Sequence, residues 1–519
     1  MGINGHCKAW TPVSVTTGKM SHADSTRHAG IPGTAGEREE EERVMAKAIT
    51  HIPERTQPSA ASWILLVVSV GCLTVLAISV PHLIGAEGWF AGARAGEKFL
   101  YVALIAYLGA SVLYGSSVAL RRADLLQSAV LFARGGLLLH TVAILARWTS
   151  SGHPPLSDIY EMVLVFSWAV VALHTLAEWK LKLPFLGAIT LPIAALALIL
   201  MQVLPGEIRP LVPALQSTWL QIHVTLAMLS YAGFTISFAV ALLYLIKDGV
   251  STRNFLTWCS ALVLGVYGAI VATSVNGNMA LTLAAWDPAT REKVMLAPRQ
   301  ALMVPLESLG WPFFIALALA TATLVINLTA TFSLRPERWD RVLRWVFWAA
   351  LGAQALALAL LLVKVQGGPY SLPGYAQDFQ VRLADSPFLL AGVATALFAS
   401  IAWKVLDWKY DSIAGYLPSR DSLDSLIYKT VAISFPLLTF MIIAGAYWAN
   451  RTWGAYWSWD PKEDWALITW LTYAGYIHMR LTRGWRGRRS AYFAIIGFAV
   501  VMFTFFGVTY LLPGLHAYA

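Results

Sequence analysis

The stretch DSLIYKTVAISFPLLTFMIIAGAYWAN, Asp424 to Asn450, is separated by two residues from WGAYWSWDPKEDW, Trp453 to Trp465. The first stretch contains an apolar run at 427–448, and about 20 apolar residues are enough for a helix to cross the core of a bilayer. The second stretch holds four tryptophans, one tyrosine and three carboxylates in thirteen residues, and a further apolar run follows at 465–481. Together they predict two membrane helices joined by a short aromatic loop.

The same kind of apolar run recurs along the chain of 519 residues, of which 57% are hydrophobic and only 13% are charged. This composition lies far outside the range of soluble globular domains. Thirteen segments are apolar and long enough to span a bilayer, so we expect an all-α, polytopic membrane protein with about thirteen transmembrane helices. The predicted spans are 62–84, 99–120, 125–147, 158–177, 184–204, 219–246, 255–274, 311–331, 342–363, 387–403, 427–448, 465–481 and 491–512.

The N-terminal region and the basic residues set the predicted orientation. Residues 1–60 are polar, with an acidic run at 37–42 and no apolar segment of the kind found in signal peptides. We expect them to form a disordered cytoplasmic tail, with Met45 as an alternative start. With the N-terminus inside, 19 lysines and arginines fall in cytoplasmic loops and 11 in the other loops, as basic residues prefer. The 453–465 loop and the C-terminus then lie outside the cytoplasm, and the net charge of +9 needs no nucleic acid.

Histidines in or beside a bilayer usually have a task, because a polar ring is costly there. His223, near the start of one span, and His516, beyond the last span, are both expected at the outer level of the aromatic loop. His478 lies about 20 Å along the helix that starts at Trp465, so we expect it to be buried in the inner half. Imidazoles that bind iron from two faces, with indoles against a porphyrin, suit a haem site. Packing histidines and an interfacial aromatic belt are the simpler alternatives.

The loop motif resembles that of a known family. Trp453-Gly-Ala-Tyr-Trp-Ser-Trp-Asp-Pro-Lys-Glu, continued by Trp465-Ala-Leu-Ile-Thr-Trp, closely resembles the "WWD" signature of haem-handling proteins, and among them the CcsA (ResC) branch of System II cytochrome c biogenesis. Supporting stretches are SGHPPLSDIYE at 151–161, TWLQIHV around His223, YAGYIHMRL around His478 and the terminal GLHAYA. The resemblance covers about 130–250 and 420–519. It is specific, since the related CcmC and CcmF families do not typically share the Tyr-Trp-Ser-Trp-Asp-Pro-Lys-Glu wording.

The resemblance implies roles for individual residues. His223 and His516 are the implied axial ligands of haem iron at an external site, and His478 is an implied iron ligand within the membrane. The implied haem-contact residues of the loop are Trp453, Gly454, Tyr456, Trp457, Trp459, Asp460, Pro461 and Glu463.

Several charged and polar neighbours are open to two interpretations. Asp460 and Glu463 are candidates for pairing with basic partners, and Arg451 or Lys462 for contact with the propionates of haem. The alternative for the basic pair is that they are ordinary solvated loop charges. His174, the only other histidine at a depth similar to that of His478, is expected to make a structural hydrogen bond.

The family comparison also implies a function. Haem b would enter from the cytoplasmic side, move to the outer site, and be presented there to apocytochrome c, whose Cys-x-x-Cys-His segment receives it covalently. A CcsB (ResB) membrane protein is the implied partner, and a bacterial inner (plasma) membrane the expected location. A haem carrier or exporter without ligation activity, and a respiratory subunit with permanent b-type haem, are the alternatives.

The chain departs from typical members in its length. Four extra predicted spans lie between the His223 helix and the helix that leads to the loop, and an even number preserves the sidedness of the flanking parts. The Trp-Asp-Pro at 286–288 in this insert is interpreted as a chance likeness. The expected parts are a tail at 1–60, the first part of the haem-handling core at 61–250, an inserted four-helix segment at 251–420, and the motif core at 421–519.

Overall fold

The computed structural model describes residues 95–512 and 514, with gaps at 182, 203, 205, 207, 209, 277–278, 291–292, 298–299 and 384–386. The tail at 1–60, the span predicted at 62–84 and the candidate ligand His516 lie outside the described residues. The described helices are α4 (Ala95–Leu120), α5 (Ala123–Ser151), α6 (Ile159–Leu181), α7 (Gly187–Gln202), α8 (Thr218–Lys247), α9 (Thr252–Asn276), α10 (Gly310–Phe332), α11 (Glu337–Gln366), α12 (Pro387–Tyr416), α13 (Arg420–Trp453), α14 (Pro461–Thr482), α15 (Arg488–Met502) and α16 (Val508–Leu511).

The all-α, polytopic expectation is confirmed for the described part of the chain. Ten of its helices are long and apolar enough to cross a membrane. The short α7 and the more polar α14 are not among the ten. Four charged side chains explain the lower hydropathy of α14, namely Lys462, Glu463, Asp464 and Arg480. The count of thirteen spans therefore remains a prediction.

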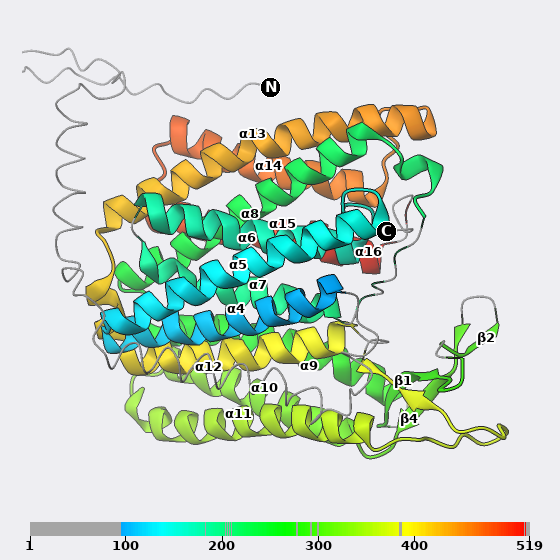
Figure 1. Ribbon diagram of the computed structural model, residues 1–519. Coiled ribbons are helices and arrows are strands. Elements are labelled where there is room, and N and C mark those ends of the chain that lie inside the picture. The colour runs from blue at the N-terminus through cyan, green and yellow to red at the C-terminus, as the bar shows by residue number, and fades with distance from the viewer. Residues whose placement is uncertain are drawn as a thin grey trace, which may run out of the picture. The chain divides into compact units, whose positions relative to one another are not determined.

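The larger hydrophobic core surrounds α8 and draws residues from α4 to α7, from α13 to α15 and from the C-terminal part of α12. In it α8 packs extensively against α13, and Figure 1 shows the two helices running beside each other. The Ser230 hydroxyl of α8 donates to the Ser434 carbonyl of α13 at 3.0 Å, and Gly233 faces the Ser434 side chain. Small residues at such contacts let two helix backbones approach closely.

The insert forms a second core, built from α9, α10, α11 and the N-terminal half of α12. Its loops contain strands that the sequence analysis did not predict. β1 (Leu281–Trp286) lies between β4 (Met303–Leu306) and β5 (Gln380–Val381) in an antiparallel sheet. A second pair joins β2 (Met295–Ala297) to β3 (Gln300–Ala301). Figure 1 shows this β-structure at the end of the helices where α13 and α15 also finish.

The tryptophan of the Trp-Asp-Pro sequence in the insert has a local structural role. Trp286 ends β1, and the Arg382 guanidinium lies 3.7 Å from the centre of its ring. The Asp287 carboxylate accepts a hydrogen bond from the Ala289 amide at 2.8 Å. These contacts stabilise the sheet and the turn that follows β1.

Candidate functional site

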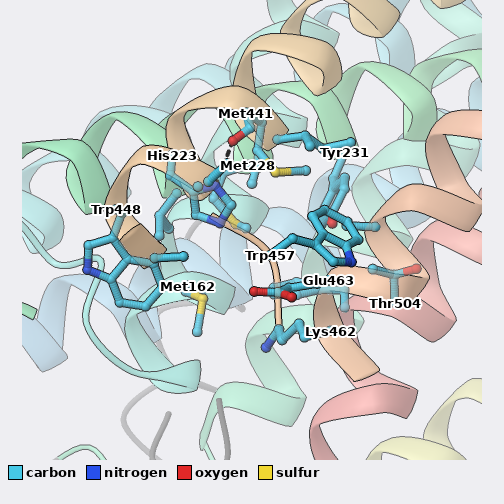
Figure 2. A pocket seen from close by; sticks show the side chains of 18 of the residues that line it. Met162, His223, Met228, Tyr231, Met441, Trp448, Trp457, Lys462, Glu463 and Thr504 are labelled. Carbon is cyan, nitrogen blue, oxygen red and sulfur yellow. Dashed lines mark hydrogen bonds between the residues drawn. The ribbon is translucent and has the colours of Figure 1, made fainter. Parts of the chain in front are cut away.

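A cavity opens where the N-terminal part of α8 meets the C-terminal end of α13, the start of α14 and the end of α15 (Figure 2). Small-molecule sites usually combine apolar walls with a few polar groups. The walls of this cavity are mainly apolar, with His223, Lys462, Glu463 and Thr504 among the polar residues that line it. The lining includes five of the residues that the resemblance implies, namely His223, Trp453, Tyr456, Trp457 and Glu463.

His223 is held by the backbone of the neighbouring helix. Its Nδ1 lies 2.8 Å from the carbonyl oxygen of Met441 on α13, as the dashed line in Figure 2 marks. Because a carbonyl only accepts, Nδ1 carries a proton, and in the neutral form of such a ring the lone pair is at Nε2. A backbone carbonyl on one ring nitrogen is the usual support for an imidazole that binds a metal through the other. The position of His223 is compatible with the ligand role that the resemblance implies.

The loop tryptophans divide into an inner and an outer set. Trp453 and Trp457 line the cavity, whereas the Trp459 side chain is 73% exposed. The buried Trp448 of α13 extends the aromatic wall: its ring centre lies 4.8 Å from that of Trp453 and 6.5 Å from that of His223. The Trp457 Nε1 is buried and has no hydrogen-bond acceptor among the described residues. A ligand with an acceptor group at that position would satisfy it.

The Asp-Pro-Lys-Glu part of the motif builds the start of α14. Asp460 is the N-cap and accepts from the Lys462 amide at 3.0 Å, while the Glu463 carboxylate accepts from the Asp460 amide at 3.3 Å and from the Ser458 amide at 2.7 Å. Pro461 occupies the first turn, where its missing N–H costs nothing. This arrangement is a capping box. The carboxylates of Asp460 and Glu463 therefore bond to backbone amides at the corner between loop and helix.

Gly454 ends the preceding helix. Its φ of 81° lies in the left-handed region, and its amide bonds back to the Asn450 carbonyl at 3.0 Å. Glycine tolerates this conformation because it has no Cβ. Gly454 therefore forms the turn that starts the loop, in addition to the haem contact that the resemblance implies for it.

Lys462 is the cation of the cavity. Its Nζ donates to the Thr509 hydroxyl at 2.9 Å, and Figure 2 shows the side chain next to Glu463. Lys462 lies before the span predicted at 465–481, and removal from water lowers its pKa to about 8, against the opposing effect of the Asp460 carboxylate. The other basic candidate, Arg451, is exposed and does not line this cavity.

The C-terminal segment returns to the same corner. A π-helix at Phe503–Gly507 interrupts α15 and brings Thr504 and Phe505 to the cavity wall. Farther along, Gly514 lies so close to Asp460 that any side chain at this position would overlap the carboxylate. The last described residue, Gly514, therefore lies beside the start of α14.

His478 lies elsewhere. It is near the C-terminal end of α14 and is not among the cavity residues. Its side chain is exposed at the surface of the described protein, so this chain does not enclose it. Its depth in the inner half of the membrane stays a prediction. The helix turns Tyr473 and Tyr476 toward the core and presents His478 on the face that also carries the exposed Ile468 and Leu471. A ligand at His478 would be covered from outside the described chain.

His174 of α6 has a different environment. The ring is fully buried; its Nδ1 lies 3.1 Å from the Thr190 hydroxyl and its Nε2 3.3 Å from the Tyr114 hydroxyl. The Tyr114 hydroxyl in turn donates to Glu178 at 2.8 Å. The expectation of structural hydrogen bonds for His174 agrees with this network.

The sequence analysis did not single out several residues of the cavity wall. Helical spacing counted from His223 and from Trp453 would have found part of them, because residues four apart share a face. Those on α8 and α13 are Val224, Ala227, Met228, Tyr231, Met441, Ile442, Gly445, Ala446, Trp448 and Ala449. Met162, Thr504 and Phe505 come from other helices, so spacing along one helix gives no signal for them.

Comparison with known proteins identifies the family. The family described as "Cytochrome C assembly protein" matches residues 156–516, which include every residue of the cavity. The chain belongs to the CcsA-type cytochrome c assembly family. It is 32% identical over 422 residues to the cytochrome c biogenesis protein CcsA of Synechococcus sp. (strain JA-2-3B'a(2-13)), which covers 80% of this chain and 92% of the relative.

Two further CcsA proteins show the same degree of similarity. The protein of Microcystis aeruginosa (strain NIES-843 / IAM M-2473) is 31% identical over 379 residues, or 72% of this chain and 81% of the relative. The protein of Nostoc sp. (strain PCC 7120 / SAG 25.82 / UTEX 2576) is 31% identical over 379 residues, or 72% of this chain and 83% of the relative. This CcsA-type chain is therefore a multi-pass membrane protein with a role in cytochrome c biogenesis.

Proposed function

We propose that the chain presents haem b at the cavity on the extracytoplasmic side for covalent attachment to apocytochrome c, as the membrane component of a synthase that includes a CcsB/ResB-type partner. The single observation that carries this proposal is the His223 ring, which projects into an aromatic cavity with its proton fixed at Nδ1 by the Met441 carbonyl. The neutral imidazole then offers Nε2 to iron.

The rest of the cavity suits the other parts of a haem. Trp448, Trp453 and Trp457 supply flat apolar surfaces for a porphyrin. Lys462 supplies a positive charge for a propionate, and the buried Trp457 N–H supplies a hydrogen-bond donor. A carboxylate bound between them would satisfy the indole and stabilise the charged form of the lysine.

His516 is the proposed second axial ligand of the external site. Gly514, two residues earlier, packs on Asp460 at the cavity corner. Two imidazoles hold iron in a low-spin state and block both axial positions, which suits a carrier that must not react with oxygen.

The reaction itself needs little from side chains of this protein. In each thioether the sulfur of an apocytochrome cysteine bonds to one vinyl carbon while the thiol hydrogen goes to the other, so the step involves no net oxidation. Release follows when the histidine of the Cys-x-x-Cys-His segment replaces one of the imidazoles from this chain. The roles proposed for His223 and His516 are therefore to hold the iron, and those of the tryptophans and Lys462 are to orient the ring.

The inner site is proposed to be shared with the partner. An exposed histidine in the membrane is costly unless another group covers it, and His478 lies on an exposed apolar face of α14. A helix of the CcsB/ResB-type protein on this face would enclose His478 and supply the second ligand for haem on its way outward. We propose a bacterial inner membrane as the location, with the N-terminus in the cytoplasm and the C-terminus outside.

The test distinguishes a chain that presents haem for attachment to apocytochrome c from one that only carries haem. The chain is expressed with its partner and a reporter apocytochrome c, and haem is measured as pyridine haemochrome in the purified chain and in the reporter. The proposal expects b-type haem on the chain and c-type haem on the reporter, both lost in His223→Ala. Haem on the chain without any c-type product would instead favour a carrier without ligation activity. Loss of neither in His223→Ala would refute the proposal.

A further inference from the structure

We propose that Gly445 is a positioning residue for His223: its missing side chain opens the Met441 carbonyl to the imidazole and so fixes the ring with Nε2 toward the cavity. The inference rests on the proposed function of His223 as an iron ligand. Gly445 lies on α13 and His223 on α8, so the contact joins two helices that pack extensively against each other in the larger core.

The space at Gly445 is filled by the imidazole itself. A Cβ at this position would lie 2.6 Å from His223 Nδ1 and 2.7 Å from Cε1. Carbon atoms in contact prefer about 3.5–4.0 Å, so even an alanine methyl would force the ring to move. The clash involves the edge of the ring that carries the Nδ1–H, which is the edge that makes the hydrogen bond to Met441.

Helix geometry explains why a glycine is needed at this position. The carbonyl of residue i in an α-helix accepts from the amide of residue i+4, so the Met441 carbonyl already serves Gly445. Helical side chains lean toward the N-terminus and cover the preceding turn. A side chain at 445 would thus cover the second lone pair of the Met441 carbonyl. With glycine, His223 Nδ1 reaches that lone pair at 2.8 Å.

The neighbours of the ring hold it in this place. Trp448, one turn after Gly445, lies nearly parallel to the imidazole at an angle of 24°. Ala446 and Ala449 are the other small α13 residues of the wall, and they leave room for the ring and for what binds it. Displacement of the ring would therefore break the bond to Met441 and turn Nε2 away from the cavity.

Other glycines of the chain provide matched controls. Gly233 lies on α8 of the same helix pair but faces the Ser434 side chain instead of His223. Gly265 of α9 has no atom within 4 Å of its Cβ position. A general packing role for glycine predicts that Gly233→Ala harms the site as much as Gly445→Ala. A positioning role predicts that only Gly445→Ala changes the ligation of iron.

The experiment measures haem content and the spin state of iron in the full chain, purified with its partner. We expect Gly445→Ala to lose the low-spin signal at least tenfold and to regain it with added imidazole, while Gly233→Ala and Gly265→Ala keep it. If Gly445→Ala keeps the wild-type spectrum while His223→Ala loses the low-spin signal, the inference about Gly445 is overturned and the proposed function is not. A wild-type spectrum in His223→Ala would overturn the proposed function instead.

A double variant guards against a folding artefact. In His223→Gly the ring is absent, so adding Gly445→Ala should change neither the amount of protein in the membrane nor the imidazole-rescued haem content. If the single variant Gly445→Ala fails to accumulate, normal accumulation of the double variant still supports a clash with the ring. Failure of the double variant to accumulate would show that the methyl collides with something else, which would overturn the inference.

Discussion

Two regions of the molecule, the insert and the cavity, differ in how some of their polar side chains are bonded. In the insert, Gln354 Nε2 lies 3.2 Å from the Ser400 hydroxyl, and Asn327 Nδ2 donates to the Thr257 hydroxyl at 2.9 Å. At the cavity, His223 Nδ1 bonds to the Met441 backbone carbonyl, and the Glu463 carboxylate accepts from the Ser458 and Asp460 backbone amides. Paired groups hold helices together, whereas groups prepared by the backbone can serve a ligand.

The largest expected difference between the two cores concerns His223. We expect His223→Ala to reduce c-type haem on a reporter cytochrome at least a hundredfold, because one axial position opens, with partial recovery in imidazole. Gln354→Leu in the insert should leave cytochrome assembly within twofold of wild type and change only stability. Assembly is measured by haem staining of the reporter. Equal losses in both variants would erase the functional distinction between the two cores.

A tryptophan pair sharpens the same comparison. Trp457→Phe removes the buried N–H and part of a flat wall, so we expect haem retention to fall about three- to tenfold. Trp408→Phe alters an indole that is 68% exposed on α12 and should have no effect. Retention is measured as haem per protein after detergent washing. Unchanged retention in Trp457→Phe would indicate that the loop is only an aromatic belt at the membrane surface.

The charge in the cavity predicts a pH dependence. The pKa of Lys462 is about 8, and a bound carboxylate should raise it because it favours the ammonium form. The contribution of Lys462 to haem affinity should therefore be constant below pH 8 and fall as the pH rises through 8, by up to about tenfold per unit. Lys462→Arg should keep its affinity above pH 8, and Lys462→Gln should be weak and flat. A spectroscopic titration that gives the same slope for wild type and Lys462→Gln would exclude the role of Lys462.

The smallest expected effect concerns Asp460. If it acts as the N-cap of α14, Asp460→Asn should behave as wild type, since asparagine caps as well, and Asp460→Ala should cost about 1 kcal/mol of stability. Thermal unfolding monitored in detergent measures the cost. If the negative charge itself contacts a partner or the ligand, Asp460→Asn would lose assembly activity together with Asp460→Ala.

Ten of the spans predicted from hydropathy coincide with described helices that are long and apolar enough to cross a membrane. Hydropathy detects them because each such helix must satisfy its own backbone hydrogen bonds within an apolar run. The strands of the insert gave no such signal, since they lie in loops between the predicted spans at 255–274 and 311–331 and beyond α11. The capping box was readable from Asp460 and Glu463, which stand three residues apart before an apolar run. The sequence analysis proposed basic partners for these two carboxylates, and the structure shows that both bond to backbone amides.

The candidate site was predictable only in part for a related reason. The loop motif and the position of His223 lie within single segments of sequence, so they could be recognised there. Other parts of the site depend on which faces α6, α8 and α13 turn to one another. These parts are the wall formed by Met162 and Trp448 and the approach of Gly445 to His223. The exposure of His478 likewise depends on the rotation of α14 in the bundle, which hydropathy does not define.

The most direct test of the central claim is a structure of the chain purified with its partner and with haem bound. The account predicts porphyrin density in the cavity beside Trp453 and Trp457, with the iron bonded to His223 Nε2 and with Nδ1 still on the Met441 carbonyl. A haem bound away from this cavity, or one in the cavity whose iron is held by other residues while His223 stands apart, would contradict it.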